Sequence, residues 1–202
     1  MSLTLSEKSN AGYDPIPAGT HIAVCCAMVD IGSQWSEQYK NASRKVMIGW
    51  ELPGETINID GEERPRTIYK RYTASLNPKA RLRKDLEAWR GQAFTDQELA
   101  AFDLVKIVGK GCMLSVIHRE YNSKIYADVA GVTAIPKGLG APDLSEPALV
   151  FDLDSASDED IEKLPEWIQK LVKNSETYKE RTVQAPELEE IPPEDDLESI
   201  PF

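Results

Sequence analysis

The chain has 202 residues, 41% hydrophobic and 28% charged, which suits one domain of ordinary size with additional chain beyond it. Its formal net charge of −11 argues, taken alone, against binding to nucleic acid or to an acidic membrane surface. The charges are segregated, however: residues 1–139 hold 18 basic and 16 acidic residues, whereas residues 140–202 hold 5 basic and 18 acidic ones. The acidity therefore belongs to the C-terminal part.

The sequence carries no pattern typical of a membrane, metal or catalytic protein. No apolar run approaches the length of about 18 residues that spans a bilayer, and residues 1–8 lack the features of a signal peptide, so we expect a cytoplasmic protein. Three cysteines and two histidines, His21 and His118, indicate neither a disulfide framework nor a zinc site. Residues 108–112 contain a Gly-Lys pair without the rest of a phosphate-binding loop. We therefore expect no metal, no cofactor and no enzymatic activity.

Two strands are predicted after a flexible leader of residues 1–15. The first covers residues 18–31, which are rich in β-branched and small apolar side chains. The second covers residues 44–52 and ends at Pro53-Gly54. Alternate positions of this second strand should face a core, namely Val46, Ile48, Trp50 and Leu52.

A third strand over residues 67–74 is followed by a predicted helix. Asn77-Pro78 has the pattern of a helix cap and first position, and Gly91 supplies the stop after Arg90. The apolar stripe of this helix consists of Leu82, Leu86 and Trp89. A capping box over residues 95–98 predicts a second short helix with Leu99 and Phe102 buried.

Two more strands, at residues 112–119 and 124–135, are joined by a hairpin turn. Three strands, a helical insertion and two strands favour a mainly β fold: a five-stranded OB barrel over residues 16–139. An SH3-like barrel or a small α+β sandwich would also accept five strands.

Residues 140–202 are predicted to be a largely disordered acidic tail. Within it, a short helical segment near residues 165–173 either docks on the barrel or binds a partner.

The strongest local charge anomaly lies between residues 64 and 90, where nine basic residues face only Asp85 and Glu87. In a chain of net charge −11, a phosphate backbone is the simplest reason for such a cluster. The candidates for DNA binding taken from this cluster are Arg64, Arg66, Lys70, Arg71, Lys79, Arg81, Arg83 and Lys84.

Aromatic side chains accompany these cations, as in proteins that stack single-stranded bases. Side chains alternate along a strand, so Tyr69 and Arg71 share one side, and Lys70 and Tyr72 share the other with Ile68. Ile68 marks its own side as core, which favours Tyr69 and Arg71 for a groove and leaves Lys70 and Tyr72 as secondary candidates. The remaining candidates are Trp35 and Tyr39 in the loop after the first strand, with Arg119 and Tyr121 near the last hairpin turn. Trp35, in a polar stretch, is the best single base-stacking candidate.

The last nine residues have the character of a peptide ligand. Residues 185–202 contain seven acidic residues and no basic one, and they end in Ile-Pro-Phe with a free carboxylate. Proline restricts the bound conformation, phenylalanine can fill a pocket, and the carboxylate can pair with a basic rim. The expected partner-binding residues within the tip, residues 194–202, are Glu194, Asp195, Asp196, Leu197, Ile200, Pro201 and Phe202.

An OB-like domain followed by an acidic tail ending in Ile-Pro-Phe resembles the single-stranded DNA-binding proteins of bacteria and bacteriophages. Leu197, Glu198 and Ser199 depart from that family's tip, which runs acidic residues almost directly into Ile-Pro-Phe. The resemblance implies a protein of the bacterial cytoplasm that protects single-stranded DNA during phage DNA replication or recombination. It also implies that the tip recruits replication and repair proteins and competes with DNA for the groove.

The resulting hypothesis is a sequence-tolerant single-stranded DNA-binding protein. The alternative is an acidic adaptor or DNA mimic that binds a basic protein. A DNA mimic should carry negative charge on its folded face, which distinguishes the two. The oligomeric state, a homo-oligomer included, and the choice between DNA and RNA are left open.

Overall fold

The β-rich stretches of the sequence form one antiparallel five-stranded sheet. The structure, a computed structural model, describes residues 14–184. The strands of the sheet are β1 (Gly19–Ser36), β2 (Asn41–Ile59), β3 (Glu62–Thr73), β4 (Gly111–Tyr121) and β5 (Lys124–Thr133). The helices are α1 (Arg81–Arg90), α2 (Asp96–Ala100), the 3-10 turn η1 (Leu104–Ile107), α3 (Asp158–Glu162), α4 (Glu166–Lys173) and α5 (Glu176–Gln184). A short strand, β6 (Leu149–Phe151), pairs in parallel with β1.

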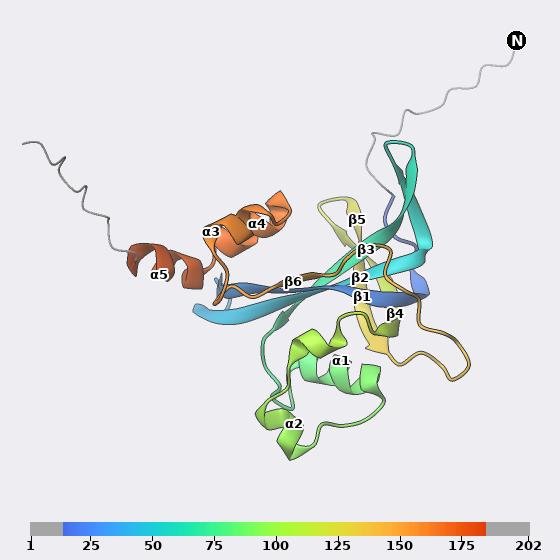
Figure 1. The fold of residues 1–202 in the computed structure, drawn as a ribbon, viewed down its shortest axis with the longest axis horizontal. Coiled ribbons are helices and arrows are strands. Elements are labelled where there is room, and N and C mark those ends of the chain that lie inside the picture. Colours follow the sequence, from blue (N-terminus) through green and yellow to red (C-terminus); the bar gives the residue numbers. More distant parts are fainter. Residues whose placement is uncertain (1–13, 185–202) are drawn as a thin grey trace, which may run out of the picture.

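The sheet is curled into a half-barrel. Its strand order is β3-β2-β1-β4-β5, so the two edge strands are β3 and β5. These edges contact each other without backbone pairing in the described residues. The prediction of a mainly β domain is confirmed, and Figure 1 shows the strands curling around one another above α1 and α2.

The concave side of the sheet holds the main hydrophobic core. The predicted alternation is confirmed in β2, where Val46, Ile48, Trp50 and Leu52 are all buried. The apolar stripe of α1 is also buried against this side, and the Trp89 ring lies 6.1 Å from that of Trp50. Burial of this stripe explains why α1 packs across the open end of the half-barrel.

The helical insertion lies between β3 and β4, as the element order predicts, but α1 begins later than expected. The Asn77 carboxamide oxygen accepts a hydrogen bond from the Lys79 amide, 3.1 Å away, and forms a turn instead of a helix cap. The cap position is Ala80, and Gly91 ends the helix in the left-handed conformation. The capping box of Thr95 and Glu98 on α2 is confirmed.

A second core covers part of the convex side of the sheet, and it corrects the expectation of a largely disordered tail. Residues 149–184, which we call the C-terminal unit, form β6 and the helices α3, α4 and α5. Ile161, Ile168 and Val172 of this unit have no exposed area and pack against Val29 and Met47 of the sheet. The segment at residues 165–173 therefore docks on the sheet, as the orange helix in Figure 1 shows.

The strands of the β1–β2 and β4–β5 hairpins also differ from their predicted limits. β1 extends to Ser36, and β2 continues past Pro53-Gly54 to Ile59 through an irregular pairing. The turn between β4 and β5 consists of Asn122 and Ser123, both at positive φ, the pattern of a tight two-residue hairpin.

No helix among residues 14–184 is long and apolar enough to cross a membrane.

Candidate nucleic-acid interface

A hollow of about 790 Å³ lies where the β1–β2 hairpin meets the end of β3 and the start of α1. We call it the basic hollow; its lining residues are Gln34, Trp35, Ser36, Lys45, Arg71, Tyr72, Thr73, Ser75, Asn77, Lys79, Ala80 and Arg81. Four of these residues are cationic and none is acidic. The remaining members are mostly amide and hydroxyl side chains, which also hydrogen-bond to phosphate and sugar oxygens.

Neighbouring strand ends position the cations of the basic hollow. Lys45 on β2 is paired across the sheet with Thr73 on β3, and its Nζ donates to the Thr73 hydroxyl over 2.7 Å. The exposed Arg71 lies two residues before Thr73 and therefore on the same side of β3. Lys79 is held at the rim by the Asn77 turn described above. These three cations form no ion pair among residues 14–184, so their charge is available to a ligand.

The fourth cation, Arg81, joins the two open edges of the half-barrel. Its Nε pairs with the buried Asp85 carboxylate at 2.8 Å, and its Nη2 donates to the carbonyl of Ala130 on β5. The same carboxylate accepts hydrogen bonds from the Tyr72 hydroxyl at 2.8 Å and the Lys70 ammonium at 3.0 Å, both on β3. The hydrogen bond that the Arg81 guanidinium donates to the Asp85 carboxylate raises the pKa of Arg81 above its ordinary value. Arg81 therefore closes the seam between β3 and β5 as well as lining the hollow.

Trp35 lies at the edge of the basic hollow with 52% of its surface exposed. The prediction of a loop position is wrong, because Trp35 belongs to β1 and pairs with Ala42 of β2. Its indole N–H donates to a carboxylate oxygen of Glu37 over 3.0 Å. A strand holds the ring more firmly than a loop would, and an exposed indole beside unpaired cations is a suitable surface for stacking a base.

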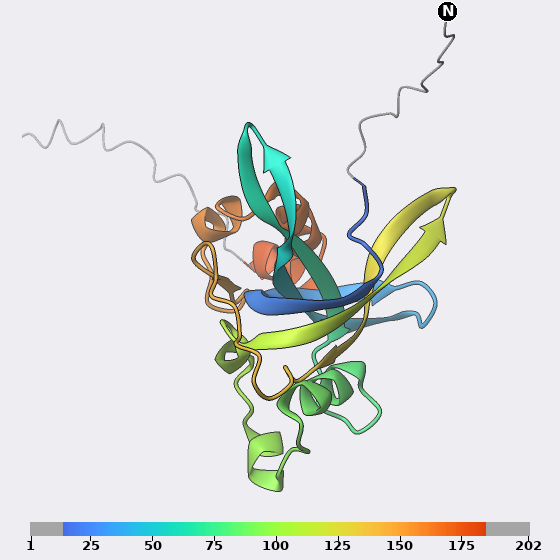
Figure 2. The ribbon, with the colours of Figure 1, turned by 90° about the vertical axis from the view of Figure 1, so that its right-hand side faces the viewer.

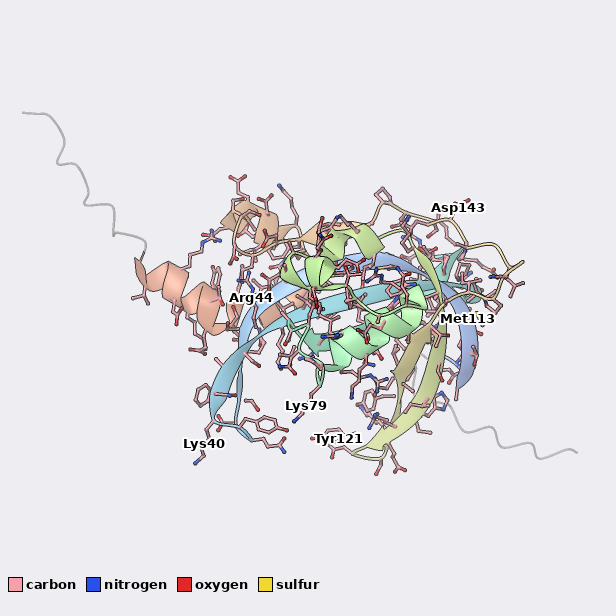
Figure 3. All side chains as sticks on the ribbon, turned by 90° about the horizontal axis from the view of Figure 1, so that it is seen from below. Lys40, Arg44, Lys79, Met113, Tyr121 and Asp143 are labelled. Carbon is pink, nitrogen blue, oxygen red and sulfur yellow. The ribbon has the colours of Figure 1, made fainter. Side chains whose placement is uncertain are left out.

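Two hairpins with tyrosines near their tips extend beyond the basic hollow. Tyr39 in the β1–β2 turn is 71% exposed, and Tyr121 at the end of β4 is 69% exposed. Figure 3 shows the two tips, marked by Lys40 and Tyr121, extending toward the same side of the molecule with Lys79 between them. Figure 2 agrees, since the light-blue and yellow hairpins extend in the same direction.

The β4–β5 hairpin adds residues that sequence reasoning missed. Arg119 is paired with the exposed Tyr126, and Tyr121 is paired with Lys124, so the four side chains share one face. The Arg119 guanidinium also forms an ion pair with Asp128 on that face. Tyr126 could be predicted only if the register of the β4–β5 hairpin were known, because that register decides which residue pairs with Arg119. The pattern of its own strand does not distinguish Lys45, because only the pairing with Thr73 on β3 brings this side chain to the basic hollow.

Three of the predicted β3 residues, Tyr69, Lys70 and Tyr72, are buried or half-buried. The ring of Tyr69 lies over Gly49 on the convex side and packs edge-to-face against Trp167 of α4, with centroids 5.0 Å apart. Burial raises the pKa of Tyr69 to about 12. Tyr69 is therefore half-buried against the C-terminal unit and does not line the basic hollow, and its role in DNA binding stays a prediction. Tyr72 is 3% exposed and Lys70 is tied to Asp85, so both serve the core and the seam, although the edge of Tyr72 reaches the hollow.

Other members of the predicted basic cluster lie elsewhere or are neutralised. Arg64, near the β2–β3 turn, pairs with Glu62 at 2.9 Å and Glu146 at 3.5 Å. Arg66 donates to the carbonyl of Asp14 in the N-terminal segment. Arg83 pairs with Glu87 at 2.8 Å, whereas the exposed Lys84 forms no ion pair among the described residues. The nine cations therefore do not form one surface.

One group of carboxylates has the spacing of a metal site. Oxygens of Asp30, Asp152 and Asp154 lie within 4.8 Å of one another. Arg44 forms ion pairs with Asp30 and, at 2.6 Å, with Asp154. A guanidinium thus already balances much of this negative charge, and the group joins the C-terminal unit to the sheet.

A comparison with known protein families finds no match to this chain. A comparison with curated proteins finds no relative either. The predicted tip residues 194–202 lie outside the described residues.

Proposed function

We propose that this protein binds single-stranded DNA with little sequence preference. The observation that carries the proposal is the basic hollow, in which Lys45, Arg71 and Lys79 have no acidic partner among the described residues and Trp35 is exposed beside them. Cations that follow a phosphate backbone next to aromatic rings that stack on bases are the common features of sequence-tolerant single-strand binding. Such a site binds an unpaired strand better than a duplex, because the bases of a duplex are already stacked on each other.

We propose further that the half-barrel is an OB-like barrel, an architecture that suits the binding of a single strand. In OB folds the β1–β2 and β4–β5 loops contact the nucleic acid, together with the face of the second and third strands. Here the two corresponding hairpins carry Trp35, Tyr39, Tyr121 and Tyr126. On the convex side, the C-terminal unit packs on β1 and reaches Met47 of β2 and Tyr69 of β3. The proposed strand path runs from the basic hollow past Arg81 to the β4–β5 hairpin.

The alternative of a DNA mimic is less well supported. A mimic presents carboxylates at the surface that a basic partner would contact. The lining of the basic hollow contains four cations and no acidic residue, which is the opposite pattern.

Fluorescence anisotropy with a labelled oligothymidylate of about 16 nucleotides tests the proposal. We expect the wild-type chain to bind the single strand more tightly than a duplex of the same length. The double variant Arg71→Glu/Lys79→Glu should lose at least about tenfold in affinity, because two attractive charges become repulsive. Lys170→Glu, on the exposed side of α4, is the matched control and should bind as the wild type does. Equal affinity of the double variant and the control would refute the assignment.

We further propose that the acidic tip recruits proteins of DNA replication or recombination. Deletion of residues 197–202 should then abolish capture of such partners and leave the affinity for single-stranded DNA intact or higher. Unchanged capture would remove this role from the tip.

A further inference from the structure

A second hollow, of about 370 Å³, lies between the C-terminal half of α1, η1 and the residues that follow β5. Its floor is apolar and is built by Leu86 and Trp89 of α1, Phe102, Ile107 of η1, and Ile135 after β5. We call it the apolar hollow. Its volume is at the small end of the range for ligand pockets, about 300–1,000 Å³, which suits one or two apolar side chains and not an extended peptide.

Three cations border the apolar hollow, and no acidic residue lines it. Lys106 and Lys110 are exposed and form no ion pair among residues 14–184. Arg90 pairs with Glu98 through Nη2, while its Nη1 is buried without a hydrogen-bond partner in the described part of the chain. The Arg90 guanidinium also lies over the rings of Phe94 and Phe102, with its carbon 4.5 and 5.6 Å from the two centroids. Lys106 and Lys110 therefore supply most of the free positive charge of the rim, which favours an anionic group there.

The apolar floor and basic rim together match a ligand that has an apolar side chain next to carboxylates. The chain itself contains such a segment. Residues 185–202 carry seven acidic residues and no basic one, and Ile200, Pro201 and Phe202 closely follow the carboxylate of Glu198. These eighteen residues, attached after Gln184, can span at most about 60 Å.

We infer that the apolar hollow is a docking site for the C-terminal residues of this chain, with Phe202 on the floor and the nearby carboxylates on Arg90, Lys106 and Lys110. This site is separate from the basic hollow, since the two share no lining residue. A docked C-terminal segment therefore leaves the proposed DNA path open, in contrast to the competition implied by the family resemblance. The inference does not require the chain to bind nucleic acid.

Photo-crosslinking of the full chain tests the inference. Phe202→p-benzoylphenylalanine keeps an aromatic ring at the terminus and forms covalent adducts with neighbouring groups under ultraviolet light. Mass spectrometry should find the adducts in residues 86–111 and 134–135. The same photoreactive residue at Val183, which is 84% exposed at the end of α5, is the matched control and should not label these peptides.

Charge reversal on the rim tests the basic contacts. Lys106→Glu/Lys110→Glu should lower the adduct yield about tenfold, whereas Lys170→Glu/Lys173→Glu, on the exposed side of α4, should not change it. A mixture of isotope-labelled and unlabelled chains shows whether the segment docks on its own copy or on a second one, and either result supports the site. Adducts mainly at residues 34–36 or 71–81, a yield that falls as an oligothymidylate is added, or the absence of defined adducts would each overturn the inference.

Discussion

The salt dependence of DNA binding follows from the number of unpaired cations in the basic hollow. Arg81 is paired with Asp85 at 2.8 Å, so the cations of the hollow without an ion pair among the described residues are Lys45, Arg71 and Lys79. Each phosphate contact on a single strand contributes about −0.7 to the slope of log affinity against log salt. Three contacts give a slope of about −2, which corresponds to a loss of about 20-fold between 50 and 200 mM salt.

Removing two of the three charges should leave about one-third of this dependence. For Arg71→Gln/Lys79→Gln we expect a slope of about −0.7 and a loss of only about threefold over the same range. The assay is fluorescence anisotropy of a labelled oligothymidylate at four or more salt concentrations. Lys170→Gln on α4 is the control, and its slope should equal that of the wild type.

Two results would refute this reasoning. A wild-type slope near zero would mean that phosphates do not meet the cations of the basic hollow. A double variant that binds with the wild-type slope would mean that the strand follows another surface.

Three further predictions concern stacking, the second core and alkaline pH. Trp35→Ala should weaken single-strand binding by about 1–3 kcal/mol in the anisotropy assay, as for one stacked base, whereas Tyr69→Phe on the covered face should not change it. Ile168→Ala should lower the free energy of unfolding by about 2–5 kcal/mol, measured as a shift of the urea midpoint, because Ile168 has no exposed area. Burial raises the pKa of the Cys25 thiol from 9.0 to about 12, so the unfolded chain releases this proton at a lower pH than the folded one. The stabilisation contributed by the buried, protonated Cys25 thiol is therefore fully present below about pH 9. It is lost as the pH rises from about 9 toward 12, by up to about 1.4 kcal/mol per pH unit.

Each of these predictions has an outcome that contradicts it. Equal losses for Trp35→Ala and Tyr69→Phe would remove Trp35 from the interface. A midpoint for Ile168→Ala no lower than that of Val183→Ala, on the exposed end of α5, would contradict the docking of the C-terminal unit. For the thiol, thermal unfolding of Cys25→Ala between pH 9 and 11 should show a flatter pH dependence than the wild type, and an unchanged slope would contradict the linkage.

Local patterns in the sequence were sufficient for the elements of the half-barrel. Alternation in β2 identified its buried side because side chains point to opposite faces of a strand. The stripe of Leu82, Leu86 and Trp89 and the glycine after Arg90 identified α1 and its end, because these signals lie within a few residues of each other. The start of α1 was missed, since the Asn77 side chain satisfies a turn as well as a helix cap.

The candidate site depended more on contacts between distant parts of the chain. The sequence names Arg71, Lys79 and Trp35 among its candidates, and the structure brings these three to one hollow. The structure separates other cations of the same cluster, such as Arg64 and Arg66. Cross-strand register brought Lys45 beside Thr73 and Tyr126 beside Arg119, and no single-strand pattern contains that information.

The amino-acid sequence by itself determined the order of strands and helices, the buried side of β2 and the segregation of charge toward the C-terminus. Only the tertiary structure decided which face of the sheet stays open. The apolar side chains of α3 and α4 are too few to fold alone, but the convex side of β1 and β2 offers Val29, Ile31 and Met47 as a second apolar surface. Burial of Ile161, Ile168 and Val172 on that surface orders the C-terminal unit, packs Trp167 against Tyr69 and leaves the basic hollow exposed.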